Sequence, residues 1–269
     1  MTPLDPEGTP DPTNTRSGFA SLLLVAGHEV RLMRRNIEAT VALLVMPLVV
    51  LALFTPLLSP LARERDLGST GAVLSVPGVL VTFGFVAVGF VAGSVFREHG
   101  WGTWTRLRTV GAPGWSVIVG KVAPHALLLL AQAAVLLAVG RIVFDLPVLD
   151  APLALLTLTV VWAFCLVGLA ATLVSVARDV QQVYLFINVG SLVLSGLGGA
   201  IVPLELFPEP LQVVARALPT YWATRAYRDV IGGAELGEIA LPIAVLLGMT
   251  VLFFAAAVWR FRFDDEKKA

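Results

Sequence analysis

Six long apolar segments dominate this chain, and each is close to or above the length that a helix needs to cross a lipid bilayer. That crossing takes about 20 residues, because the hydrocarbon layer is roughly 30 Å thick. The predicted spans are 39–58, 73–96, 122–139, 152–176, 183–203 and 239–259. Hydrophobic residues make up 57% of the 269 positions and charged residues 14%, a composition that a water-soluble fold of this size could not bury. The sequence therefore predicts an all-α, polytopic membrane protein with six transmembrane helices.

Basic residues are distributed unevenly between the loops that join these spans. If both termini share one side, thirteen of the 19 Lys and Arg residues lie on that side. Cytoplasmic loops are enriched in Lys and Arg, so we expect a multi-pass protein of the cell membrane with both termini in the cytoplasm. The formal net charge is zero and does not indicate a nucleic-acid partner.

The chain is predicted to form one transmembrane domain, residues 19–269, preceded by a disordered cytoplasmic tail, residues 1–18, which is rich in Pro, Thr and Asp. Residues 19–38 are predicted to form an amphipathic helix in the cytoplasmic membrane surface, with its arginines at the lipid headgroups. Its apolar stripe is Phe19, Leu22, Leu23, Ala26, Val30, Met33 and Ile37, and His28, Arg31, Arg35 and Glu38 lie opposite. The alternative is a cytoplasmic helix packed on a partner protein.

The segment between the fifth and sixth spans, residues 204–238, is longer than a turn requires and is patterned. After Pro208 we expect a first helix, with Leu211, Val214 and Leu218 on one side and Gln212 and Arg216 on the other. Thr220 could cap a second helix that carries Trp222, Ala226 and Val230 and ends at Gly232-Gly233. Two such helices suggest an external re-entrant hairpin, which is tolerated at membrane depth where protein shields its backbone. A plain surface loop is the alternative.

Gly120-Lys121 raises the question of a phosphate-binding loop, but the spacing is wrong. The motif G-x-x-x-x-G-K-[ST] requires glycine where Trp115 stands and a hydroxyl where Val122 stands. We therefore expect no nucleotide to bind to this chain.

Ionisable groups for catalysis or ion coupling are also missing from the predicted spans, which contain no Asp or Glu. The polar exceptions are His125, Gln132 and Asn188. His28-Glu29 lacks the second histidine of a zinc protease motif, and Cys165 is the only cysteine. A membrane hydrolase or a proton-coupled carrier is therefore disfavoured, and we predict no catalytic residue, no metal ligand and no cofactor bound by this chain.

Small residues recur at four-residue spacing in two spans, and such residues allow helix backbones to approach closely. They are Gly89 and Gly93 in the second span and Ser191, Ser195 and Gly199 in the fifth. Packing within the chain and a seam between two copies are both consistent with this pattern.

Three segments, taken in order, resemble the membrane subunits of ABC exporters, in the type-2 permease family that includes drug and polyketide-antibiotic exporters. The first contains Arg97-Glu98, Gly102-Thr103-Trp104 and Arg106-Leu107-Arg108, followed by Pro113 and Gly120-Lys121. The second is GLAATLVSVARDVQQV, residues 168–183, and the third and most specific is GGAIVPLELFPEPLQVVARALPTYWATRAYRDVIGG, residues 198–233. With the span count, the resemblance covers residues 19–262.

The resemblance implies a permease without an ATPase of its own, working as two membrane units, here expected to be a homodimer, with two copies of a separate ABC ATPase subunit. ATP and Mg would be bound by that partner. The family's coupling helix follows the second span, so the matching residues Arg97, Glu98, Gly102, Thr103, Trp104, Arg106, Leu107 and Arg108 are expected to contact the ATPase, with Arg178 and Asp179 as a second contact. Trp101, Trp104 and Arg108 could share one helix face suited to a protein partner. The alternative is a loop that only satisfies the positive-inside rule.

The function implied is export of a lipophilic small molecule, such as a drug or natural-product antibiotic. We predict that the translocation path is lined by Gly89, Gly93, Asn188, Ser191, Ser195 and Gly199, and that an external gate is formed by Pro203, Glu205, Phe207 and Tyr221. The alternatives are a lipid or lipid-linked glycan exporter of the same architecture and a membrane anchor that transports nothing. Membrane lipids are the other expected partners, and no nucleic acid is expected.

Overall fold

The computed structural model describes residues 18–66, 70–100, 114–177 and 179–260. Helices make up 84% of the structure, and the described residues form no strand, so the predicted all-α class is confirmed. The elements are α1 (Gly18–Arg35), α2 (Ile37–Glu64), α3 (Ala72–Gly100), α5 (Gly114–Phe144), α6 (Pro152–Val176), α7 (Val180–Leu197), η1 (Leu204–Leu206), α8 (Glu209–Ala215), α9 (Pro219–Ile231) and α10 (Ala240–Arg260).

Within the described residues, five helices are long and apolar enough to cross a membrane. Their apolar parts are Thr40–Glu64, Ala72–Gly89, Val122–Phe144, Pro152–Val176 and Ala240–Arg260. The predicted fifth span, 183–203, corresponds to α7, whose apolar part Gln181–Leu197 is shorter than these. The helix ends at Leu197 because the chain turns at Gly198 and then at Gly199, where φ is +82°. Residues 198–203 therefore do not continue this span, and the count of six remains a prediction.

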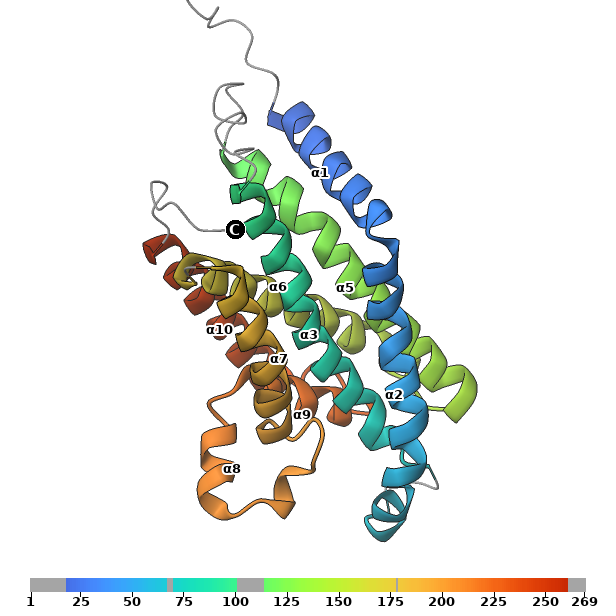
Figure 1. The fold of residues 1–269 in the computed structure, drawn as a ribbon. Coiled ribbons are helices and arrows are strands. Elements are labelled where there is room, and N and C mark those ends of the chain that lie inside the picture. Colours follow the sequence, from blue (N-terminus) through green and yellow to red (C-terminus); the bar gives the residue numbers. More distant parts are fainter. Residues whose placement is uncertain (1–17, 67–69, 101–113, 178, 261–269) are drawn as a thin grey trace, which may run out of the picture.

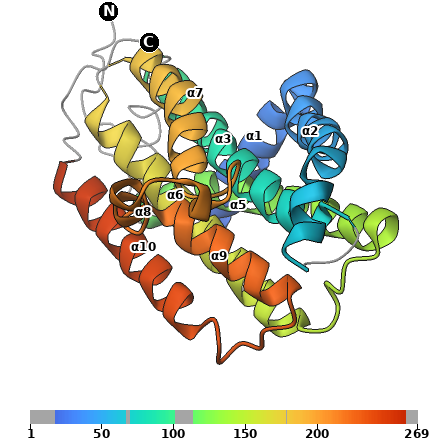
Figure 2. The same ribbon diagram turned by 90° about the horizontal axis from the view of Figure 1, so that it is seen from below.

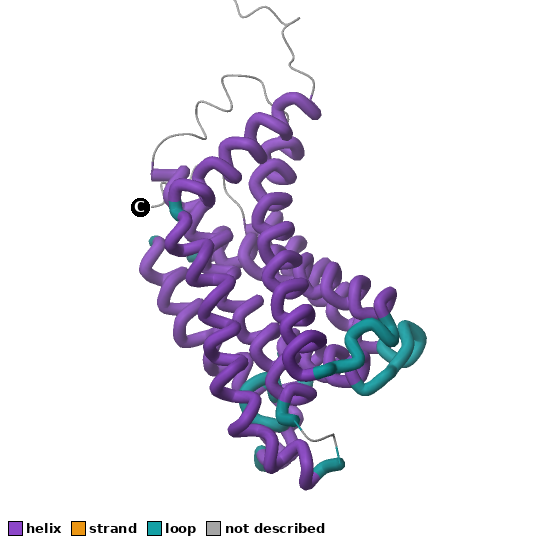
Figure 3. The backbone as a smooth tube through the Cα atoms, turned by 90° about the vertical axis from the view of Figure 1, so that its right-hand side faces the viewer, coloured by secondary structure: helices purple, strands orange, loops and turns teal. Residues whose placement is uncertain are grey.

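The helices are arranged around α3 and α6 (Figures 1 and 2). In the most apolar stretch of these two helices, 78% and 72% of the residues are buried. The corresponding share in α2, α5 and α10 is 22–28%. The peripheral helices thus expose apolar side chains outward, as a lipid environment requires. Most described loops lie at one end of the bundle (Figure 3). The start of α1 and the end of α10, at the two ends of the described chain, lie toward the opposite end (Figure 1).

Helices α6 and α10 form the most extensive helix pair. Gly168 in α6 leaves room for Phe253 and Phe254, since an added Cβ would lie 3.2 Å from a side-chain atom of Phe253. The Thr172 hydroxyl donates to the Phe253 carbonyl at 2.7 Å. A small residue and an interhelical hydrogen bond together fix this pair.

Hydroxyl groups join α2 to α3. Thr55 Oγ1 and Ser75 Oγ are 2.8 Å apart, and the backbone N–H of Gly71 donates to Ser59 Oγ at 3.1 Å. A Cβ at Gly71 would overlap the Thr55 carbonyl oxygen, so the backbones approach as closely as glycine allows.

Gln132 compensates for a proline in α2. Pro47 has no N–H, and the carbonyl of Leu43, four residues earlier, therefore lacks its helical partner. The Gln132 side chain of α5 donates to this carbonyl at 3.1 Å. The buried amide thus ties α2 to α5 where the helix ladder of α2 is interrupted.

Replacing Gln132 with leucine is expected to destabilise the protein by about 0.5 to 2 kcal/mol, the range for hydrogen bonds between membrane helices. The Leu43 carbonyl would then have no hydrogen-bond donor in apolar surroundings. Thermal unfolding in detergent measures the change, and Gln181→Leu, at an exposed position on α7, is the matched control. Equal melting temperatures for the two variants would contradict the assignment.

The predicted helix 19–38 is interrupted at Asn36, where φ is −98° and ψ is 45°. Its first part, α1, runs beside the first half of α5 (Figure 1). Gly120 provides this contact, because an added Cβ would lie 2.8 Å from Val25 Cβ and 2.9 Å from the Leu22 carbonyl oxygen. The Gly120-Lys121 pair therefore begins a helix–helix seam, and its glycine serves close packing.

Candidate functional site

Three of the predicted coupling residues, Arg97, Glu98 and Asp179, are described, and they lie where α3 ends and α7 begins (Figure 1). Arg97 and Glu98 lie in the last turn of α3. Asp179 is the N-cap of α7, and its carboxylate accepts from the backbone N–H of Gln182 at 2.7 Å. The following predicted coupling residues lie outside the described residues: Gly102, Thr103, Trp104, Arg106, Leu107, Arg108 and Arg178.

Of the two predicted path residues in α3, Gly89 lies at its contact with α7. A Cβ at Gly89 would lie 3.0 Å from Ile187 Cδ1, and Gly93 is buried. The buried residues Ala92, Val174, Val183 and Ile187 form a separate apolar cluster here. Gly89 therefore brings α3 and α7 together within the chain.

The predicted path residues of α7 lie on different faces. Ser191 and Ser195 are buried at 4% and 0% exposure, whereas Asn188 is exposed and its amide donates to the Tyr184 carbonyl at 2.8 Å. Gly199 lies beyond the helix end. Asn188 thus places a polar amide on a helix face that otherwise exposes Leu185, Val189 and Leu192.

The segment after α7 contains the two predicted short helices, but they differ in burial. Helix α8 buries only Ala215, whereas α9 packs against α3, α6 and α10 and buries most of its length. Gly232 caps α9 and Gly233 has φ of +100°, as the predicted end requires. Thr220 does not cap α9, because Leu218 is the N-cap and the Thr220 hydroxyl donates to the Leu194 carbonyl at 2.7 Å.

Tyr227 anchors α9 in the bundle. Its side chain is fully buried, and its hydroxyl donates to Thr159 Oγ1 of α6 at 3.1 Å. Thr159 donates in turn to the Leu155 carbonyl at 2.7 Å. This chain of bonds satisfies the tyrosine hydroxyl inside an apolar core, so α9 is fixed in one position.

The predicted gate residues have separate surroundings. Pro203 is buried and is the N-cap of η1, and the Phe207 carbonyl accepts from the Gln212 side chain at 2.9 Å. Tyr221 stacks edge-on against Trp222, with ring centroids 5.1 Å apart, and its hydroxyl accepts from Arg225 at 3.4 Å.

Glu205, the fourth predicted gate residue, pairs with Arg65 at the end of α2, with the two charged atoms 2.9 Å apart. Burial acts to raise the pKa of the Glu205 carboxyl, but the hydrogen bond from Arg65 and the charges of Arg65 and Arg228 outweigh it and lower that pKa. Arg228 also donates to the Gly199 carbonyl at 2.7 Å. Ionic and polar contacts therefore hold the turn after α7 between α2 and α9.

A groove of about 600 Å³ opens beside this charged cluster. It is lined by Val73, Leu74, Arg228, Asp229, Gly232, Gly233, Ala234 and Glu238. Burial raises the pKa of the Asp229 carboxyl. The groove is thus lined by one basic and two acidic side chains and by apolar residues from the first turn of α3.

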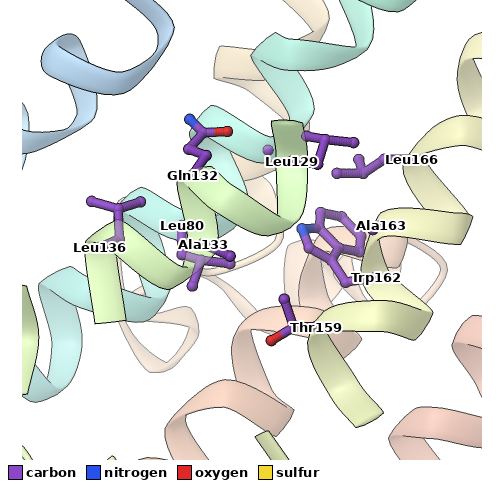
Figure 4. Close-up of a pocket in the computed structure, with 10 residues that line it drawn as sticks. Leu80, Leu129, Gln132, Ala133, Leu136, Thr159, Trp162, Ala163 and Leu166 are labelled. Atoms are coloured by element: carbon purple, nitrogen blue, oxygen red, sulfur yellow. The ribbon is translucent and has the colours of Figure 1, made fainter. Parts of the chain in front are cut away.

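A cavity of about 10 Å³ lies between α3, α5 and α6 (Figure 4). It is lined by Leu80, Gly84, Leu129, Gln132, Ala133, Leu136, Thr159, Trp162, Ala163 and Leu166. Trp162 Nε1 has no hydrogen-bond partner among the described residues. The volume suits about one water molecule and is far below the hundreds of Å³ that a drug-sized ligand needs. This cavity therefore cannot be a cargo site.

Tyr227, Arg228, Arg65 and Trp162 were not predicted as site residues from the sequence. Their partners are distant along the chain, as with Tyr227 and Thr159, which are 68 positions apart. The one sequence signal for them was that Tyr227 and Arg228 lie on a short amphipathic segment, now α9, which the sequence analysis assigned to the hairpin. Among the described residues, no group of three His, Cys, Asp or Glu could hold a metal ion.

Comparison with known proteins identifies relatives for most of the chain. A family model described as ABC-2 family transporter protein matches residues 55–259. The linearmycin resistance permease protein LnrN of Bacillus subtilis is 24% identical over 198 residues, which cover 73% of this chain and 50% of the relative. The probable multidrug ABC transporter permease YbhR of Escherichia coli K12 is 28% identical over 196 residues, which cover 71% and 51%. The chain thus spans about half the length of these curated relatives. No solved structure matches it.

Proposed function

Because this chain belongs to the ABC-2 family of transporter proteins, we propose that it is the membrane-spanning subunit of an ATP-driven exporter. The match over residues 55–259 is the observation that carries the proposal. It includes α3, α5, α6, α7, α9 and nearly all of α10, so the family resemblance covers the central helices of the bundle. The subunit resides in the cell membrane, with both termini in the cytoplasm.

ATP and Mg are bound by a separate ABC ATPase, two copies of which dock at the cytoplasmic end of the bundle. The two predicted coupling segments support this, since one follows α3 and the other joins α6 to α7 at the same end. Closure of the ATPase pair pushes on the ends of α3 and α7. These two helices then move together, because Gly89 lets them pack closely.

A second copy of the permease faces α7, and the cargo crosses between the two copies. The exposed amide of Asn188 supports this arrangement, because a polar group on a membrane helix is expensive in lipid and marks a functional contact. Ser191, Ser195 and Gly93 lie behind this face, and the turn containing Gly199 ends it. Pro203, Glu205, Phe207 and Tyr221 close the outer end, which opens when the hairpin moves.

The cargo is a lipophilic small molecule. The relatives named for linearmycin resistance and multidrug transport support this class, as does the predominance of apolar side chains in the bundle. Export of a lipid or a lipid-linked glycan would be recognised by ATPase stimulation with that substrate and none with hydrophobic drugs.

Replacing Glu98 or Arg106 with alanine is expected to uncouple ATP hydrolysis from export. Truncating one member of a charge pair in a protein interface costs about 2 to 5 kcal/mol, enough to reduce export by tenfold or more. The measurement compares drug export and ATPase activity of the co-purified complex in proteoliposomes. Arg216→Ala, exposed at the outer end, is the matched control.

Unaltered export in the Glu98→Ala and Arg106→Ala variants would refute the coupling assignment. A complex whose ATPase activity never responds to any substrate would instead favour a membrane anchor without transport.

A further inference from the structure

Helix α1 has three faces with different surroundings. The first packs on α5 and contains the buried residues Ser21, Val25 and Glu29, which recur every four positions. Because α5 covers this face, only the other two faces of α1 can contact lipid or a partner outside the described bundle.

The second face is an exposed apolar stripe. Its members recur at helical spacing and continue onto the first residue of α2, with exposures of 65% for Phe19, 55% for Leu23, 45% for Val30 and 60% for Ile37. In water this stripe would be unfavourable, whereas lipid acyl chains would cover it.

The third face is basic and concave. Arg31, Arg34 and Arg35, with His28 and Leu32, line a groove of about 420 Å³. Within the described part of the chain, none of the three arginines takes part in an ion pair. Three guanidinium groups on one turn and a half of helix provide many hydrogen-bond donors for a phosphate.

We propose that this groove binds the headgroup phosphate of an anionic phospholipid in the leaflet where α2 begins. Arg34 and Arg35 precede Thr40, at which the apolar part of α2 starts, by a few residues. This position puts the guanidinium groups at headgroup depth, and the neighbouring apolar stripe receives the acyl chains. A soluble phosphate would satisfy the same donors but would leave the stripe uncovered.

The test uses the full chain in nanodiscs of phosphatidylcholine, with and without phosphatidylglycerol. We expect phosphatidylglycerol to remain bound in native mass spectrometry and to raise the melting temperature. Arg31→Gln, Arg34→Gln and Arg35→Gln together should weaken lipid binding by about a hundredfold, a factor of roughly five for each arginine. The lysine triple variant, which keeps the charge, should retain most of the binding.

The control replaces three exposed arginines elsewhere, Arg141, Arg216 and Arg260, with glutamine. It should bind phosphatidylglycerol like the unaltered chain. Equal loss in the control, or no loss in the glutamine triple variant of α1, would overturn the proposal. Equal stabilisation by inorganic phosphate alone would also overturn it. If the glutamine triple variant of α1 lost ATPase co-purification but still bound lipid, the groove would be assigned to a protein partner instead. The lipid-binding and melting readouts depend neither on transport nor on an ATPase, so they stand apart from the proposed export function.

Discussion

Replacing Tyr227 with alanine is expected to destabilise the protein by about 3 to 5 kcal/mol, the cost of truncating a large buried aromatic side chain. The Tyr227 side chain is completely buried, with 0% of it exposed. It belongs to α9, which packs against α3, α6 and α10. The substitution would leave a cavity and remove the hydrogen bond to Thr159. Thermal unfolding of the purified chain, followed by intrinsic fluorescence, measures the loss.

Two control variants separate the contributions at this position. Tyr227→Phe removes only the hydroxyl and should cost about 1 kcal/mol. Tyr221→Ala removes a half-buried tyrosine near the start of the same helix and should cost less than Tyr227→Ala. If Tyr227→Ala melted at the temperature of the unaltered chain, α9 would not be held in the bundle as described.

Replacing Gly78 with valine is expected to displace the turn after α7 or to prevent folding. The cost should be at least the upper end of the range for overpacked cores, about 3 kcal/mol, because the clash is with backbone. A Cβ at this position would overlap the Ala200 carbonyl oxygen. Backbone atoms cannot rotate away as a side chain can, and Arg228 also holds the neighbouring Gly199 carbonyl through a hydrogen bond. The yield of folded protein and its melting temperature measure the result.

Gly248→Val is the matched control, because Gly248 also lies in a membrane helix but has nothing within 4 Å of an added Cβ. It should fold normally, and since valine has a higher helix propensity than glycine it could melt slightly higher. Equal yields for the two variants would contradict the tight contact at Gly78.

The sequence predicted best what depends on local apolarity. The predicted span 152–176 coincides with α6, because Pro152 begins the helix and every turn after it is apolar. The span 183–203 was predicted too long because its composition stays apolar through Ile201 and Val202, whereas the turn is imposed by Gly198 and Gly199. Composition does not reveal where a glycine pair ends a helix.

Contacts between distant residues could not be predicted in this way. Thr220 has the residue type of a helix cap, yet its hydroxyl bonds to Leu194 because α7 and α9 pack together. The predicted apolar stripe of residues 19–38 is not the face of α1 that contacts α5, which contains Ser21, Val25 and Glu29. The seam instead uses Gly120, whose close approach to Val25 no periodicity could indicate.

The hydroxyl contacts between α2 and α3 also bear on how the chain enters the membrane during synthesis. Thr55 and Ser75 satisfy one another, and Ser59 accepts from Gly71, so all these partners are present once the first two spans have been made. A pair of helices in which these hydroxyl groups are already matched can leave the translocon together at lower cost than either helix alone. We therefore expect α2 and α3 to insert as a hairpin, which then serves as the surface on which the later helices assemble.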